Sequence, residues 1–130
     1  MGEKIVGIGI DICEVDKMRN LFFQFTKQEL SLIFTEKELN YIELNKMNLF
    51  ILFSLKESLT KALGIGFNSK LSELKKIEFS LNGNYIENVS VKENFSEILH
   101  EKNVILINSD FTITRNLIIT KVLLIGDKGV

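Results

Sequence analysis

The stretch Ile5-Val6-Gly7-Ile8-Gly9-Ile10-Asp11-Ile12 determines how the chain begins to fold, because it reads as a β-strand with two unlike faces. Side chains alternate between the two faces of a strand. One face carries the branched aliphatic residues, which are Val6, Ile8, Ile10 and Ile12. The other carries two glycines and one acid, which are Gly7, Gly9 and Asp11. We expect the aliphatic face to join the core and the glycine face to form a groove floor with a carboxylate at one end.

A second informative stretch, Phe53–Gly66, reads as the end of a long helix that is expected over about residues 48–63. Leucines recur there at helical spacing, at Leu52, Leu55, Leu59 and Leu63. Gly64 follows as a favourable helix stop. Glu57 and Lys61 stand four residues apart, so they share one helix face. A carboxylate beside a lysine, just before a Gly-x-Gly turn, suits a site for magnesium and phosphate.

Composition limits the class of protein. The chain has 130 residues, 45% hydrophobic and 25% charged, which is typical of one globular domain with a real core. A net charge of −1 does not favour nucleic acid or an anionic membrane as a partner. The longest apolar run, Leu49–Phe53, is too short to span a bilayer, and no signal peptide is visible. The single cysteine, Cys13, suits a reducing compartment and is expected to pack as a small apolar residue.

The order of the predicted elements places the chain in the α+β class, as a single domain over residues 1–130. Strands are expected over residues 4–12, 75–81, 84–86, 104–114 and 117–125, and helices over about 14–25, 36–45, 48–63 and 93–101. Thr35, followed three residues later by Glu38, predicts a capping box at a helix start. Asn82-Gly83 predicts a two-residue hairpin turn, and Arg115-Asn116 predicts the turn between the last two strands.

The two stretches together resemble the holo-acyl-carrier-protein synthases, the short 4′-phosphopantetheinyl transferases. The first motif of that family, G-I-G-x-D-I-x-E, stands here as Gly7–Glu14. The second, F-x-x-K-E-x-x-x-K-A-x-G-x-G, stands as Phe53–Gly66. Between them, Phe34–Leu39 resembles the family's T-x-x-E-L stretch. Seen alone, an aspartate ending a strand is usually a turn residue, and a Glu–Lys pair is usually a solvated helix face. The joint presence of both motifs in the family's order favours the functional interpretation.

The resemblance implies a fold, an activity and partners. The family has a 4′-phosphopantetheinyl transferase-like α+β fold, with an antiparallel-rich sheet packed against a long helix. It assembles as homotrimers whose active sites lie between neighbouring subunits. It transfers 4′-phosphopantetheine from coenzyme A to a serine of apo acyl carrier protein, with Mg²⁺, and releases 3′,5′-ADP. We therefore expect coenzyme A and an acyl carrier protein as partners, no nucleic acid and no membrane. The expected location is cytoplasmic, or an organellar stroma if a transit peptide was removed.

The resemblance also implies roles for individual residues. Asp11 and Glu57 would bind the magnesium ion, and Lys61 would contact a phosphate of coenzyme A, so these three form the expected catalytic set. Lys56 would either contact a phosphate as well or pair with a neighbouring acid. The serine proton would pass to a water on the metal, to Glu57 or to another nearby base.

Further residues are implied at the edges of the site. Gly64 and Gly66 would let the backbone approach the nucleotide, and Thr112 would keep one hydroxyl contact with it. Lys17 and Arg19 would contact the acidic carrier protein.

The chain departs from the family pattern in two places. The stretch 107–114 lacks the histidine that the family commonly carries there, and Leu52 stands where the family often has an arginine. These departures motivate an alternative function, a catalytically impaired homologue that binds coenzyme A or serves as a structural trimer.

Overall fold

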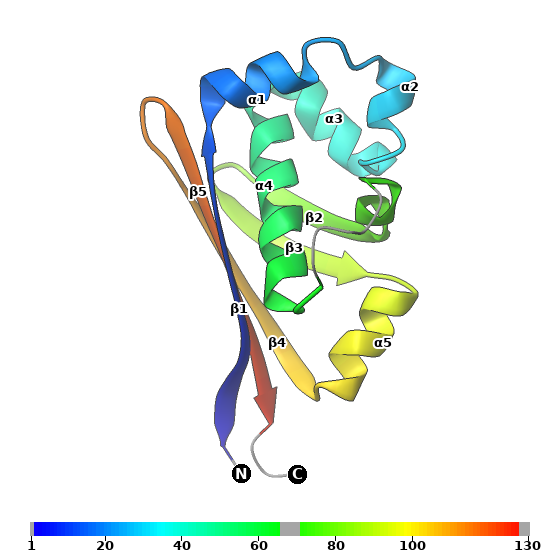
Figure 1. Ribbon diagram of the computed structural model, residues 1–130, viewed down its shortest axis with the longest axis vertical. Helices are drawn as coiled ribbons and strands as arrows, with labels where there is room; N and C mark the ends of the chain where they lie inside the picture. The colour runs from blue at the N-terminus through cyan, green and yellow to red at the C-terminus, as the bar shows by residue number, and fades with distance from the viewer. Residues whose placement is uncertain (1, 66–70, 128–130) are drawn as a thin grey trace.

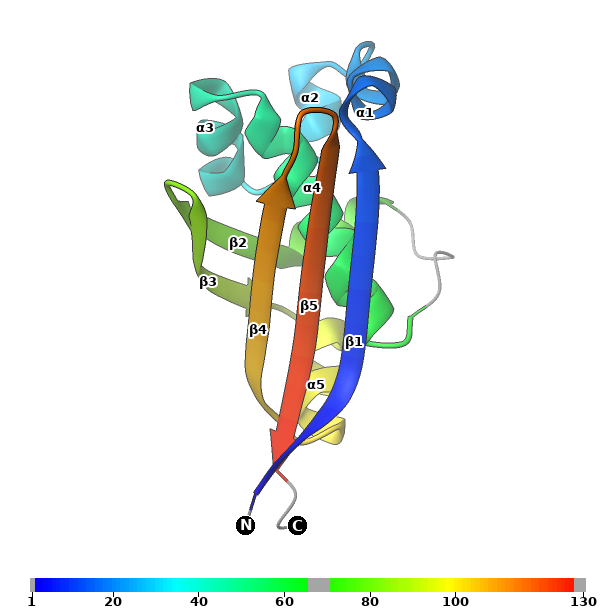
Figure 2. The ribbon, with the colours of Figure 1, turned by 90° about the vertical axis from the view of Figure 1, so that its left-hand side faces the viewer.

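A three-stranded antiparallel sheet runs the length of the molecule. The computed structural model describes residues 2–65 and 71–127. Its longest strands are β1 (Glu3–Glu14), β4 (Val104–Ile113) and β5 (Leu117–Asp127), in the order β1-β5-β4 (Figure 2). The first and last thirds of the chain therefore meet in one sheet. A strand forms at each predicted place, and the turn at 115–116 is confirmed, but the bounds of the strands differ from the prediction. The last ends two residues later, the one expected over 84–86 covers 85–91, and the one expected over 75–81 begins at 77 because residues 75–76 belong to a 3-10 helix.

The long helix α4 (Met47–Ala62) packs along one face of this sheet (Figure 1). The glycines of β1 make this close approach possible. A Cβ atom added at Gly9 would lie 1.7 Å from the carbonyl oxygen of Ser58, and one at Gly7 would lie 2.2 Å from that of Ala62. No side chain fits in that space, so the glycine face of β1 is the surface on which α4 lies.

The face of β1 that was expected in the core is exposed from Ile8 onward, so the prediction is wrong there for the single chain, whereas Val6 is half-buried against the core. Ile8, Ile10 and Ile12 are 56%, 51% and 62% exposed. The physical reason is the shape of the two faces: branched side chains would hold the helix away, whereas glycines let its backbone come close. Ile5 and Leu106, which both pair with Ile125, are exposed on the same face of the sheet. Figure 2 shows this outer face of the sheet without any covering helix.

Three shorter helices close one end of the molecule. They are α1 (Val15–Phe22), α2 (Lys27–Leu30) and α3 (Glu36–Leu44). The predicted capping box at Thr35 and Glu38 is confirmed, since each side chain bonds the other's backbone N–H. A second capping box, between Thr26 and Glu29, starts α2, which the sequence analysis did not predict.

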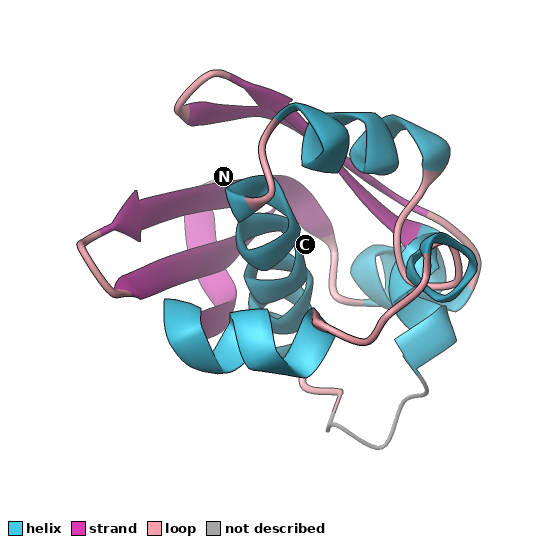
Figure 3. Cartoon of the chain, turned by 90° about the horizontal axis from the view of Figure 1, so that it is seen from above, coloured by secondary structure: helices cyan, strands magenta, loops and turns pink. Residues whose placement is uncertain are grey.

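A second, two-stranded sheet packs beside the helices (Figure 3). The 3-10 helix η1 (Leu71–Lys76) leads into β2 (Ile77–Asn82) and β3 (Tyr85–Val91), and α5 (Asn94–Glu101) follows. Asn82 pairs with Tyr85, so the turn is Gly83-Asn84, one residue later than predicted. Gly83 supplies the positive φ of 62° that this turn needs.

The arrangement confirms the α+β class. None of the helices in the described ranges is long and apolar enough to cross a membrane.

Candidate active site

Asp11 on β1 and Lys61 on α4 meet where the helix crosses the glycine face of the strand. The Nζ atom of Lys61 lies 3.0 Å from Oδ1 of Asp11 and also donates to the carbonyl oxygen of Ile10 at 3.1 Å. Asp11 is buried, whereas the side chain of Lys61 is 45% exposed. Lys61 is therefore a partly exposed cation that is paired with a buried carboxylate.

Glu57, one helical turn before Lys61, completes the group. Burial raises the pKa of Glu57 to about 7, and the charge of Asp11 and a hydrogen bond with the Asp11 carboxyl add to the increase. The two carboxyl groups are thus near neighbours that compete for ionisation. The predicted convergence of a strand aspartate and a helix glutamate is present in the structure.

The other oxygen of Asp11 is held from inside the protein. Its Oδ2 accepts a hydrogen bond of 2.8 Å from Oγ of Ser54 and one of 2.9 Å from the thiol of Cys13. Burial alone would raise the pKa of Asp11, but these two hydrogen bonds and Lys61 outweigh it and lower the pKa. Asp11 is therefore ionised near neutral pH, while Glu57 is in part protonated.

Cys13 is buried, as predicted, but it is also a hydrogen-bond donor to the site. Burial, with the hydrogen bond to Asp11 next in effect, raises the pKa of its thiol to about 12. The thiol consequently keeps its proton and donates it to the carboxylate.

The sequence analysis missed the buried hydroxyls around Asp11, which belong to Ser54, Ser58 and Thr120. A signal was available for two of them. Ser54 and Ser58 stand four residues apart in an otherwise apolar part of α4, so they share one face of the helix. No sequence signal near Thr120 indicates its role, because it lies beside Asp11 through the pairing of β1 with β5.

Lys56 does not face this site. Its side chain is fully buried, and its Nζ donates to Glu38 at 2.6 Å and to the carbonyl oxygens of Ile33 and Leu74, each at 2.9 Å. An ammonium group has three donors, and all three are used. The structure therefore contradicts the predicted phosphate contact and supports the alternative, pairing with an acid.

Glu38 is the central acceptor of this buried pair. Its carboxylate also accepts from the backbone N–H groups of Phe79 and Thr35. The pair joins α3, α4 and β2 in the core, so Lys56 has a structural role.

Gly64 lies just after α4 in the left-handed conformation, with φ of 77°. The N–H of Ile65 bonds the carbonyl of Thr60 at 3.1 Å, and that of Gly64 bonds the carbonyl of Lys61 at 3.0 Å. This is the Schellman arrangement that ends a helix. No atom of residues 2–65 or 71–127 lies within 4 Å of a Cβ placed at Gly64. Gly66 lies outside the described residues.

Thr112 lies on the opposite face of the sheet from Asp11. In the strand register Thr112 is paired with Ile119, which is paired with Ile12 on the exposed face. Directly opposed residues of neighbouring strands share a face. Thr112 therefore cannot join Asp11 within one chain, and its predicted contact requires a neighbouring subunit.

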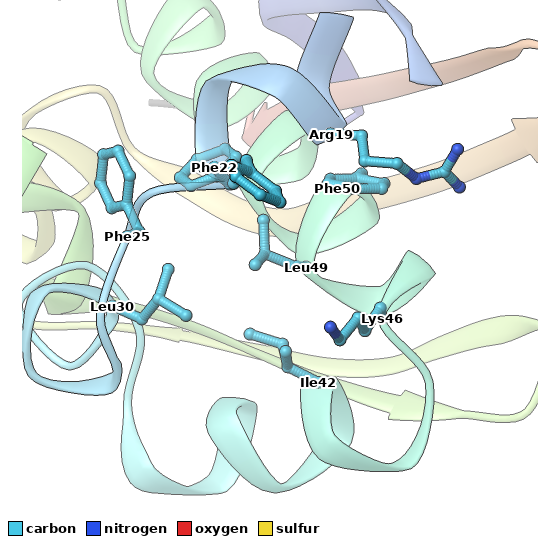
Figure 4. A pocket seen from close by; sticks show the side chains of 9 residues that line it. Arg19, Phe22, Phe25, Leu30, Ile42, Lys46, Leu49 and Phe50 are labelled. Carbon is cyan, nitrogen blue, oxygen red and sulfur yellow. The ribbon is translucent and has the colours of Figure 1, made fainter. Parts of the chain in front are cut away.

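The predicted partner residues Lys17 and Arg19 are exposed on α1. Each is paired within its own turn, Lys17 with Glu14 at 3.1 Å and Arg19 with Asp16 at 3.6 Å. Arg19 also lines a pocket of about 280 Å³ whose other cation is Lys46, at the start of α4. Figure 4 shows the two cations at one side of the pocket and apolar side chains around the rest of it, from Phe22, Phe25, Leu30, Ile42, Leu49 and Phe50.

The donor set of Asp11 and Glu57 fits magnesium. Among the residues that the structure describes, no group of three or more His, Cys, Asp or Glu side chains is placed to hold a metal ion. Magnesium does not need one, because it binds one or two carboxylates together with water and substrate phosphates. Two adjacent carboxyl groups, one with its pKa raised by the other, are stabilised by a divalent cation.

Comparisons with known proteins agree on one family. The model of the 4′-phosphopantetheinyl transferase superfamily matches residues 7–115. A holo-[acyl-carrier-protein] synthase of Clostridium perfringens (strain ATCC 13124) is 39% identical over 109 residues, which are 74% of this chain and 81% of that protein. The one from Chlamydia muridarum is 35% identical over 103 residues, 77% of this chain and 81% of that protein. With the homologue from Clostridium perfringens strain 13, the alignment reaches 43% identity over 48% of each chain.

Solved structures share the fold. The crystal structure of a holo-ACP synthase from Plasmodium yoelii has a TM-score of 0.78 at 18% identity, over 98% of this chain and 100% of that one. That of a holo-[acyl-carrier-protein] synthase from Helicobacter pylori, in complex with coenzyme A, has a TM-score of 0.71 at 21% identity, over 90% and 98% of the two chains.

Proposed function

Because this chain belongs to the 4′-phosphopantetheinyl transferase superfamily, we propose that Asp11, Glu57 and Lys61 form the active site of a holo-acyl-carrier-protein synthase. The enzyme transfers 4′-phosphopantetheine from coenzyme A to a serine of apo acyl carrier protein. The observation that carries the assignment of the site is the meeting of Asp11 with both Glu57 and Lys61 on the glycine face of β1.

The chemistry is the attack of a serine hydroxyl on a phosphorus atom of a pyrophosphate, with 3′,5′-ADP as the leaving group. The physical difficulty is negative charge, which is already present on the phosphates and increases on the leaving group. Magnesium held by Asp11 and Glu57 would neutralise part of this charge. Glu57, whose pKa burial raises to about 7, is in part protonated near neutral pH, and the protonated fraction would release its proton on binding a cation.

Lys61 supplies the positive charge of the chain itself. Its partly exposed ammonium group is a compact point charge with three donors, suited to a phosphate oxygen. In the absence of ligands it pairs with Asp11, so it sits next to the proposed phosphate position before substrate binds. The open backbone at Gly64, three residues further on, supports a close approach of the nucleotide.

A homotrimer is part of the proposal. The uncovered aliphatic face of the large sheet favours a subunit contact, because exposed apolar surface of this kind is stabilised by burial. Thr112 lies on that face, so a neighbouring subunit is the means by which it would reach a site. A cytoplasmic location stays a prediction.

The carrier protein is proposed to dock at α1. Lys17 and Arg19 are exposed there, and Lys46 adds a third cation beside Arg19 at the rim of the apolar pocket (Figure 4). A partner with acidic side chains around an apolar one would match this surface.

The alternative, a catalytically impaired homologue, rests on two departures from the family pattern. The first departure, Leu52 in place of an arginine, gives little support to this alternative. Leu52 is fully buried in the core, so its position does not face the solvent. The other, the absence of a histidine in residues 107–114, continues to motivate this alternative.

Mass spectrometry decides between the two functions. The chain is incubated with coenzyme A, magnesium and a proven cognate apo carrier protein, and the carrier is weighed. A gain of one phosphopantetheine unit is expected. Asp11→Asn and Glu57→Gln should abolish the gain while far-UV circular dichroism stays unchanged, and Glu97→Gln on α5 serves as a matched acid-to-amide control away from the site. No gain with the wild-type chain, or an undiminished gain in both site variants, contradicts the proposal.

A further inference from the structure

Three hydroxyl side chains lie buried between α4 and the large sheet, directly behind Asp11. All three are fully buried, namely Ser54, Ser58 and Thr120. They contact one another across the helix–sheet interface. Oγ of Ser54 lies 2.8 Å from Oγ1 of Thr120, and Oγ of Ser58 lies 2.6 Å from the same atom. Thr120 is also the residue paired with Asp11 in the strand register. The three hydroxyls and the carboxylate therefore form one continuous group.

The direction of these hydrogen bonds follows from counting protons. A hydroxyl donates once, and an ionised carboxylate donates nothing. The hydroxyl of Ser54 donates to Oδ2 of Asp11, at 2.8 Å, so its single proton is already used. Oγ of Ser54 is then free to accept from Thr120, and Oγ1 of Thr120 is free to accept from Ser58. Oγ1 of Thr120 also donates to the backbone carbonyl oxygen of Ser54 at 3.1 Å, and Oγ of Ser58 donates to that of Thr120 at 3.4 Å. Thr120 therefore contacts both the hydroxyl and the backbone of Ser54, and Ser58 contacts Thr120 from behind.

Packing alone does not account for this group. A buried hydroxyl costs free energy unless it is hydrogen-bonded, and alanine or valine would fill these positions without that cost. The rest of the interface is apolar, including Ile118 and Val122 on either side of Thr120. The hydroxyl nearest the site, that of Ser54, donates to Oδ2 of Asp11, where Cys13 adds a second donor.

The two oxygens of Asp11 are consequently unlike. Oδ2 receives two donors from buried side chains, whereas Oδ1 accepts from Lys61, which is partly exposed. We propose that Ser54, with Thr120 and Ser58 behind it, is a positioning residue that fixes Oδ2 of Asp11 and so presents Oδ1 to the divalent cation. This inference rests on the proposed magnesium site.

Cation affinity distinguishes a residue that positions Asp11 from one that only stabilises the fold. Binding of Mn²⁺ to the full chain with coenzyme A is measured by electron paramagnetic resonance, and the magnesium activation constant of the transfer is measured beside it. Ser54→Ala should weaken cation binding by about 10-fold, as expected when a partner behind a metal ligand is lost. Thr120→Val, which keeps the shape of the side chain, should weaken it in the same direction by a smaller factor. The KM for coenzyme A should not change.

Two further variants act as controls. Thr120→Ser keeps the hydroxyl and should recover most of the affinity that Thr120→Val loses. Thr60→Val removes a buried hydroxyl of the same helix that bonds only the carbonyl oxygen of Glu57, so cation affinity should stay at the wild-type value.

Each outcome has one meaning. Lower melting temperatures with unchanged cation affinity in Ser54→Ala and Thr120→Val overturn the positioning role, and Thr120→Val alone decides if Ser54→Ala does not fold. If the wild-type chain binds no cation and needs none for transfer, the proposed metal site and this inference are both wrong. If the wild type binds and both variants match it, only the inference is wrong.

Discussion

Lys61 is ion-paired with Asp11, Nζ to Oδ1 at 3.0 Å, so the proposed phosphate-binding lysine occupies the oxygen that is proposed to receive the cation. The pairing exists because glycines at positions 7 and 9 let α4 lie against β1. In the proposed mechanism, cation and lysine would compete for this oxygen, and magnesium binding would release Lys61 toward the phosphates. Such an exchange would couple metal binding to substrate binding.

Lys61→Gln tests the exchange. Loss of a hydrogen bond to a charged group costs about 1.5–3 kcal/mol, so the KM for coenzyme A should rise by at least about 10-fold. In the absence of coenzyme A, Mn²⁺ should bind more tightly than to the wild type, because Asp11 has lost its competing partner. Steady-state kinetics and electron paramagnetic resonance give the two numbers. An unchanged KM would contradict the proposed contact between Lys61 and a phosphate of coenzyme A.

Gly9→Ala should be strongly destabilising. The added Cβ would lie 1.7 Å from the carbonyl oxygen of Ser58, so α4 must move off the sheet, and overpacking costs about 1–3 kcal/mol or more. Gly83→Ala is the matched control, because nothing lies within 4 Å of its Cβ and only the strain of a positive φ is added, about 1 kcal/mol. Urea denaturation of both variants measures the difference. Equal losses would mean that the close contact of β1 with α4 is not as described.

The elements of this fold could be predicted because their signals are local. The alternation in residues 5–12 and the leucine spacing in α4 depend only on neighbours along the chain. Which face of β1 is buried could not be predicted, since that depends on how closely a helix more than forty residues away can approach. Large aliphatic side chains normally indicate a core face, but here the absence of side chains at Gly7 and Gly9 decided the packing.

The same limit applies to the site. Asp11, Glu57 and Lys61 were identifiable from the family motifs, and the structure brings them together. Thr120 and Ser54 are 66 residues apart, and no motif connects them. The family resemblance left two roles open for Lys56, a phosphate contact or an acidic partner. Its contact with Glu38, 18 residues away, favours the second.

Lys56→Met should unfold the protein more readily without altering the site. Removing one partner of a buried ion pair leaves the other charge uncompensated and typically costs about 3–5 kcal/mol. The double variant Lys56→Met with Glu38→Gln should lose less than the sum of the single variants, because no buried charge remains. Chemical denaturation of the four proteins gives the coupling energy.

The exposed pair Lys27–Glu43, with its 2.6 Å contact, provides the comparison for Lys56, and Lys27→Met should change stability little. Where Lys56→Met stays folded, its KM for coenzyme A should equal that of the wild type. A raised KM for coenzyme A in the folded variant would indicate that Lys56 contacts a phosphate after all.

The stability of the metal-free protein should fall with rising pH because of Glu57. Its pKa is raised from 4.5 to about 7 in the folded state, so the unfolded chain loses this proton first. The contribution of Glu57 to the free energy of unfolding is complete below its unfolded pKa and is lost as the pH rises through about 7. Glu57→Gln cannot ionise, so at about pH 8 the variant should gain stability relative to the wild type, compared with the same difference at about pH 5. Magnesium should restore the wild type at the higher pH and leave the variant unchanged. Denaturant midpoints at the two pH values, with and without the cation, measure the effect, and parallel pH profiles of the two proteins would show that folding does not raise the pKa of Glu57.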